Sequence, residues 1–177
     1  LVQMAHAMDY LLSREPPRFH RALKAANILV DSDHKRAFLA DFGLACLDQP
    51  ELIEGSLPRV APELFDGDPY TDRCDVYSFG MLMWEVHHNE SPWQDVSNAL
   101  VIEKVSDGVR PKVDTDKPMR ESYRQLMERC WHQTPAQRPL FGDVVQRLEL
   151  LQHIVGIPTA EYSFSFEISE KLPWRIN

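Results

Sequence analysis

Apolar residues recur every three or four positions over four stretches of the chain, and a fifth stretch is apolar on almost every side. In the first stretch, residues 1–13, Leu1, Met4 and Met8 share one helical stripe. Residues 75–86 form the stretch without a polar face, which predicts a fully buried helix. Three further helices are expected near residues 98–107, 120–131 and 141–155.

Strand-like segments are few. Residues 27–31 and 36–40 flank a polar turn and predict a short β-hairpin, and the Gly- and Pro-rich residues 41–63 predict a long structured loop. Residues 162–168 alternate aromatic or apolar side chains with Ser and Glu, which is strand periodicity. We therefore expect a mainly α (α+β) domain over residues 1–155, followed by an extension over residues 156–177 that holds a strand.

Composition narrows the class of protein. The 177 residues suffice for one domain with a sizeable core, and the net charge of -8 disfavours nucleic acid and anionic membranes as partners. No apolar run is long enough to predict a transmembrane segment. The three cysteines are scattered without a Cys-x-x-Cys pair, which favours reduced thiols and a cytoplasmic location. Because the chain opens within a helical pattern and without Met, we expect a fragment.

Short motifs follow one another in a specific order. Residues 20–27 read His-Arg-Ala-Leu-Lys-Ala-Ala-Asn, and they are followed by Asp-Phe-Gly at 41–43, Ala-Pro-Glu at 61–63, Asp-Val-Tyr-Ser-Phe-Gly at 75–80 and a Cys-Trp…Arg-Pro ending at 130–141. Each motif is weak alone, but the ordered series resembles the C-terminal, or large, lobe of a eukaryotic protein kinase over about residues 1–155. The resemblance implies ATP-dependent phosphoryl transfer to a protein.

The resemblance implies a role for several polar residues. Asp41 matches the principal Mg²⁺ ligand, Asn27 the second ligand, and Lys24 the lysine that contacts the γ-phosphate. Leu29 matches the floor of the adenine pocket, with Leu82 and Val86 packed beneath it. The simpler alternative for Asn27 and Asp41 is a role in a turn or cap.

Other matches are architectural. His20 and Phe42 match two members of the family's regulatory spine, and Asp75 matches the residue that anchors the catalytic loop from below. Glu63 and Arg138 match a buried ion pair at the end of the activation segment. These residues imply a stable lobe rather than turnover.

Two departures from the family pattern bear on activity. Ala22 stands where the family carries the Asp that accepts the proton of the attacking hydroxyl, and losing a general base typically costs about 10²–10⁴-fold in rate. The chain also has no Gly-rich phosphate loop and no Val-Ala-Ile-Lys strand, so the small lobe is absent from it. We therefore expect weak binding of ATP and Mg²⁺ by this chain.

Other residues bear on regulation by the activation loop and on the type of residue that is phosphorylated. Arg21 matches the arginine that grips an activation-loop phosphate, whereas Ser56, the only hydroxyl residue between Asp41 and Glu63, matches a structural Thr. Acidic residues of the same loop could pair with Arg21 instead, although a solvated surface role is the simpler interpretation: Asp48, Glu51 and Glu54. Lys24 and Ser56 are of serine/threonine type, and together with the Asp-Val-Tyr-Ser-Phe-Gly motif they resemble the tyrosine-kinase-like group of serine/threonine kinases.

Three hypotheses remain open from the sequence. The chain is part of a serine/threonine kinase that is inactive or very slow because of Ala22, acting on a protein substrate. Alternatively it is a pseudokinase module that binds and regulates a partner protein, such as another kinase. A third hypothesis is that Ala22 is an engineered inactivating change.

Overall fold

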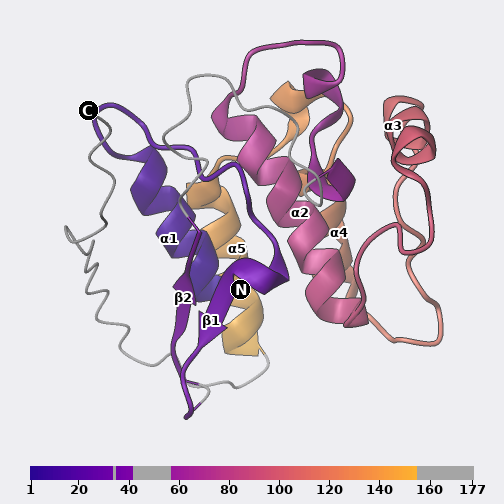
Figure 1. The fold of residues 1–177 in the computed structure, drawn as a ribbon. Helices are drawn as coiled ribbons and strands as arrows, with labels where there is room; N and C mark the ends of the chain where they lie inside the picture. The colour runs from indigo at the N-terminus through magenta and orange to yellow at the C-terminus, as the bar shows by residue number, and fades with distance from the viewer. Residues whose placement is uncertain (34, 42–56, 155–177) are drawn as a thin grey trace.

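The central element is helix α2, Asp72–His88, around which the other helices are arranged (Figure 1). The computed structural model describes residues 1–33, 35–41 and 57–154, to which the structural observations below refer. Two acidic residues, Asp72 and Asp75, lie in the first turn of α2, where carboxylates stabilise the helix dipole. The helix ends at Asn89, which adopts the left-handed conformation with φ 54°. The helix is thus longer at both ends than the predicted residues 75–86.

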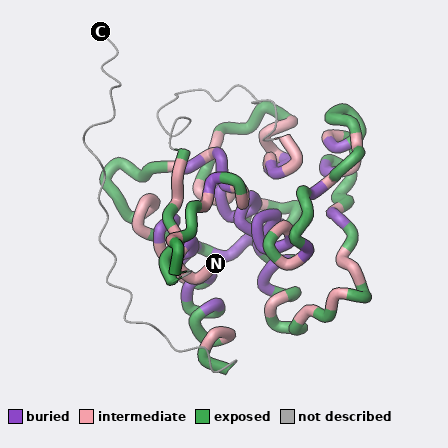
Figure 2. The backbone as a smooth tube through the Cα atoms, turned by 60° about the horizontal axis from the view of Figure 1, so that its bottom comes forward, coloured by how far each residue is buried: buried purple, intermediate pink, exposed green. Residues whose placement is uncertain are grey.

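The remaining helices pack on α2 or on each other. Helix α1 (Val2–Leu12) packs against α5 (Phe141–Ile154), and α4 (Glu121–Cys130) packs against α2. Helix α3 (Asn98–Ser106) contacts short 3₁₀ turns that precede α2 in the chain: Leu57–Arg59 and Pro62–Leu64. Two further 3₁₀ turns cover Ala25–Asn27 and Pro135–Gln137. Buried residues gather along α2 at the centre of the molecule (Figure 2), which confirms the predicted buried helix.

A close approach between α2 and the end of α4 depends on Gly80. A Cβ atom placed there would lie 2.9 Å from the backbone nitrogen of Trp131 and 3.0 Å from the Cβ of Cys130. Both distances are shorter than normal carbon contacts, so the absence of a side chain lets the helices meet. The glycine therefore determines how deeply α2 sits in the core.

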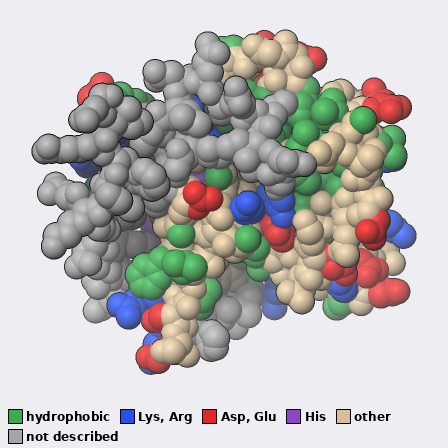
Figure 3. All heavy atoms as spheres, in the orientation of Figure 1, with side chains coloured by type: hydrophobic (Ala, Val, Ile, Leu, Met, Phe, Trp, Pro, Cys, Tyr) green, Lys and Arg blue, Asp and Glu red, His purple; other side chains and the backbone are tan. Residues whose placement is uncertain are grey.

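The β-hairpin pairs β1 (Ile28–Val30) with β2 (Ala37–Leu39) in antiparallel register, with Leu29 opposite Phe38. In the connecting turn, Oδ1 of Asp31 accepts the backbone N–H of Arg36 at 3.1 Å. Exposed apolar side chains gather on the hairpin (Figure 3), where Leu29 and Phe38 share one face and Val30 points to the other. The predicted hairpin is confirmed.

The fold agrees with the expected mainly α class of a kinase large lobe. Cys74 and Cys130 are buried free thiols, as predicted, whereas Cys46 lies outside the described residues. The same holds for several other predictions, which concern Phe42, Gly43, Asp48, Glu51, Glu54, Ser56 and the strand at residues 162–168. Among the described residues, no helix has the length and apolarity needed to cross a membrane.

Candidate active site

The loop that carries Ala22 is held by a buried carboxylate at the start of α2. Asp75 accepts the backbone N–H groups of His20 and Arg21, both at 2.9 Å, and the hydroxyl of Tyr70 donates to it at 2.6 Å. Burial raises the pKa of Asp75, and these three hydrogen bonds oppose that rise. Arg21 has φ 66°, an uncommon conformation for a residue with a side chain. The paired backbone bonds to Asp75 hold the loop in this conformation.

His20 links the loop to the residue that precedes Asp41. Its ring is fully buried, with Nε2 3.1 Å from the carbonyl of Ala40, while Nδ1 accepts the backbone N–H of Ala22 at 3.3 Å. Burial lowers the pKa of His20, which favours the neutral ring. A neutral ring protonated on Nε2 satisfies both contacts. His20 therefore connects the loop that carries Ala22 to the backbone at Ala40.

Three of the predicted site residues lie together. The amide nitrogen of Asn27 donates to the carbonyl of Ala22 at 2.7 Å and to Oδ2 of Asp41 at 3.3 Å. Because a carbonyl can only accept, the Ala22 contact fixes which way the Asn27 amide faces and turns its Oδ1 elsewhere. Asp41 is exposed. The nitrogen side of the Asn27 amide therefore faces both the Ala22 carbonyl and the Asp41 carboxylate.

This pair suits Mg²⁺ bound together with phosphate. Mg²⁺ prefers oxygen ligands and is usually held by one or two protein groups, the rest being water and phosphate oxygens. Asp41 carries two carboxylate oxygens and Asn27 one amide oxygen, which are ligand atoms of the kind that Mg²⁺ prefers. Among the described residues no group of three His, Cys, Asp or Glu side chains converges, so a self-sufficient metal cage is not formed there.

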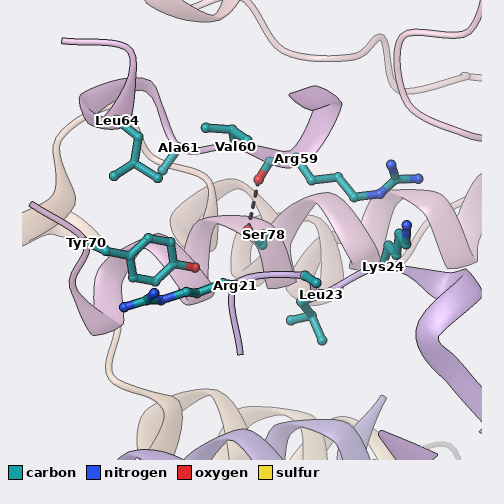
Figure 4. Close-up of a pocket in the computed structure, with 10 residues that line it drawn as sticks. Arg21, Leu23, Lys24, Arg59, Val60, Ala61, Leu64, Tyr70 and Ser78 are labelled. Carbon is teal, nitrogen blue, oxygen red and sulfur yellow. Dashed lines mark hydrogen bonds between the residues drawn. The ribbon is translucent and has the colours of Figure 1, made fainter. Parts of the chain in front are cut away.

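A small cavity of about 20 Å³ lies between the catalytic loop and the segment that leads into α2 (Figure 4). Lys24 and Arg59 extend to one side of it, and Arg21 and Tyr70 lie at the other. Lys24 forms no ion pair with a described residue.

An ion pair that the sequence analysis missed connects this region to α2. Arg59 and Glu85 are both largely buried, with Nη2 and Oε1 2.6 Å apart, and Glu85 also accepts the backbone N–H of Ala25 at 3.2 Å. The signal in the sequence was Glu85 itself, a charge that follows nine uncharged, mostly apolar residues of α2. Its partner could not be identified because the two residues are 26 positions apart.

The arginine before Ala22 packs on aromatic rings. The guanidinium carbon of Arg21 lies 5.2 Å from the ring centre of Tyr70 and 5.9 Å from that of Phe19. These distances are within the range of cation–π attraction. The expected contact of Arg21 with the activation segment falls on residues outside the described part of the chain.

The predicted adenine floor is open. Leu29 is 58% exposed, and Val86, expected to pack beneath it, is itself 48% exposed. Leu82 is fully buried, as expected. Val86 differs from the prediction because it lies on the exposed side of α2, whereas Trp84 and His88 on either side of it are buried.

Below the site, Glu63 and Arg138 form the ion pair that the sequence predicted. Two parallel hydrogen bonds join them, at 2.6 Å and 2.7 Å, and the Arg138 side chain has no exposed surface. Burial raises the pKa of Glu63, but the hydrogen bonds and charge of Arg138 outweigh burial and bring it below its ordinary value. The thiol of Cys74 donates to the same carboxylate at 3.3 Å.

Comparisons with known proteins agree with this geometry. A family model described as protein tyrosine and serine/threonine kinase matches residues 1–148. A protein of Acanthamoeba polyphaga mimivirus, named as a serine/threonine-protein kinase/receptor, is 36% identical over 151 residues, which cover 84% of this chain and 9% of the relative. Mitogen-activated protein kinase kinase kinase 7 of Homo sapiens is 33% identical over 161 residues, covering 88% of this chain and 26% of the relative.

The chain thus spans between about a tenth and about a quarter of the length of these relatives. The match covers the loop that carries Ala22, the residues Asn27 and Asp41, and the buried ion pair described above. On these grounds, the chain belongs to the protein kinase family and corresponds to the large lobe of a kinase domain.

Proposed function

We propose that this chain is the large-lobe part of a serine/threonine protein kinase domain whose phosphoryl transfer is inactive or very slow. The proposal rests on the set of polar residues that lie around Ala22. The residue lies within a site whose other polar members are in place, yet its methyl group can neither accept nor orient a proton. A protein substrate and a cytoplasmic setting belong to the same proposal.

Mg²⁺ bound with ATP would be held by Asp41 and by Oδ1 of Asn27. The metal would neutralise charge on the phosphates during transfer. Lys24 would bind the γ-phosphate, because its ammonium group lies at the cavity edge and is not committed to a described carboxylate. Leu29 would contact the adenine from below, with the other face of the base covered by a small lobe that this chain lacks.

The step that lacks a protein group is the removal of the proton from the acceptor hydroxyl. In a complete site a carboxylate orients the acceptor hydroxyl and takes its proton as the hydroxyl oxygen attacks phosphorus. Ala22 leaves water as the only acceptor at that position. Since the metal-binding and phosphate-binding groups remain, we expect residual transfer about 10²–10⁴-fold below that of a complete site.

The test compares the full-length protein with its Ala22→Asp variant. Transfer of labelled phosphate from ATP to a serine peptide should rise by about 10²–10⁴-fold in the variant. Ala22→Asn is the matched control, because its amide has the size of aspartate without its basicity, and it should give no such rise. A native protein as fast as its Ala22→Asp variant would contradict the proposal.

A second candidate function is that of a pseudokinase that regulates a partner protein, such as another kinase. It is favoured by the contrast between the missing base and the complete buried network around Asp75 and Arg138. Under this hypothesis the Ala22→Asp variant would remain inactive, and binding to the partner would be unchanged. The same pair of variants therefore separates the two functions.

A further inference from the structure

We propose that the cavity beside Ala22 binds a small monocarboxylate, of the size of formate, that supplies the base which the chain lacks. The inference rests on the proposed function and names a ligand for the same site. It would make the protein a kinase whose rate depends on a diffusible anion.

The cavity has a suitable place and size. Ala22 is 5% exposed and is one of the residues that line it. Replacing the carboxylate of an aspartate by hydrogen leaves the methyl group of alanine, and formate carries the part that is removed. A volume of about 20 Å³ exceeds the roughly 10–15 Å³ that one water molecule needs. Larger carboxylates would meet apolar side chains of the lining, which come from both sides of the cavity: Leu23 on one side and Ala61 and Leu64 on the other.

The charges around the cavity favour an anion. Among the described residues that line it, three are cationic and none is acidic, and the cations are Arg21, Lys24 and Arg59. Glu85 neutralises Arg59. Lys24 has no such carboxylate among the described residues, so it is the cation that would pair with the bound anion.

Ser78 and Tyr70, whose hydroxyl groups belong to the described lining of the cavity, do not act as the proton acceptor. Ser78 donates its hydroxyl to the carbonyls of Arg59, at 2.8 Å, and Cys74, at 3.2 Å (Figure 4 shows the first of these). The Tyr70 hydroxyl donates to Asp75. Burial also raises the pKa of Tyr70 well above its ordinary value, so Tyr70 does not replace the missing base.

The chemical step balances with the carboxylate as proton acceptor. The acceptor hydroxyl oxygen forms a bond to the γ-phosphorus of ATP, and its proton moves to the carboxylate. The bond between the γ-phosphorus and the bridging oxygen breaks, and ADP leaves with that electron pair. The carboxylic acid then releases its proton to water, which regenerates the carboxylate.

The test measures phosphorylation of a serine peptide without acidic residues by the full-length protein, with increasing formate at constant ionic strength. Formate should raise the native rate by at least about tenfold, within the deficit left by the lost base. Acetate should act more weakly and propionate not at all. An equal response to formamide, which is neutral and similar in size, or no response to formate would overturn the proposal.

Binding is measured separately by the line width of ¹³C-labelled formate in NMR. Native protein should broaden the line, and both Ala22→Asp and Ala22→Asn should broaden it less, because each side chain fills the cavity. If Ala22→Asp gains activity but native protein neither broadens the line nor responds to formate, the carboxylate site is wrong and the proposed function stands. If Ala22→Asp stays inactive while formate binds only the native protein, the proposed kinase function fails and the anion site stands.

Discussion

Two polar networks meet at the catalytic loop, one beneath it and one at its open edge. Beneath the loop, Asp75 and the Glu63–Arg138 pair are buried, and every charge has a partner of opposite sign or several hydrogen-bond donors. At the open edge, Asp41 is exposed and Lys24 has no ion-pair partner among the described residues. The lower network is buried and internally paired, whereas the groups of the upper one are exposed or unpaired among the described residues.

The comparison explains why the loss of a base at position 22 is compatible with a folded lobe. Ala22 contributes to the lower network only through its backbone, which accepts from Asn27 and donates to His20. Those contacts do not depend on the side chain. Chemistry and stability are therefore separable at this residue, and each substitution below tests that separation.

The largest loss of stability is expected for Arg138→Met. The substitution leaves the Glu63 carboxylate buried without its cation, which should lower the free energy of unfolding by about 3–5 kcal/mol. Urea unfolding followed by the fluorescence of the buried Trp84 and Trp131 measures the effect. Arg124→Met is the control, since Arg124 pairs with Glu121 on the surface and its removal should change little.

A second prediction concerns the contact between α2 and α4. Gly80→Ala places a methyl group 2.9 Å from the backbone of Trp131 and should destabilise the chain by about 1–3 kcal/mol. Gly142→Ala is the matched control in α5, because the nearest atom to its new methyl group is 3.6 Å away. The control should be neutral or stabilising by up to about 1 kcal/mol. Equal effects of the two substitutions on the urea midpoint would refute the packing argument.

Lowering the pH should reduce the contribution of the Glu63–Arg138 ion pair to the stability of the chain. The pKa of Glu63 is below its ordinary value of 4.5 in the folded chain, so its contribution is present above that value and is lost as pH falls through the lowered pKa. The urea midpoint of the native chain should therefore decline more steeply below pH 4.5 than that of Glu63→Gln. Parallel declines in the two proteins would show that Glu63 is not responsible.

The smallest effect on stability is expected at the open edge. Asp41→Asn should change the free energy of unfolding by less than about 0.5 kcal/mol, because Asp41 is exposed and Asn tolerates its φ of 65°. In the full-length protein the same substitution should abolish the Mg²⁺ dependence of nucleotide binding. Asp33→Asn removes a carboxylate from an exposed turn and should leave that dependence intact. A strongly destabilised Asp41→Asn would remove the distinction between the two networks.

Much of this arrangement could be predicted from the chain. Periodicity located the five described helices, and the resemblance of the motifs paired Glu63 with Arg138 across 75 positions. The Arg59–Glu85 pair was missed, because neither residue belongs to a motif and no local pattern relates them. The exposure of Val86 was missed as well, since apolar character alone does not reveal which side of a helix is covered.

The sequence by itself determined the family, the helical class and the absence of a carboxylate at position 22, because these depend on residue identity and order. Only the tertiary structure decided that the Ala22 carbonyl orients the Asn27 amide toward Asp41. It also decided that a small cavity lies beside Ala22, with three cationic side chains among its described lining residues. Both features arise where segments distant in the chain meet, and distances between such segments depend on packing rather than on local pattern.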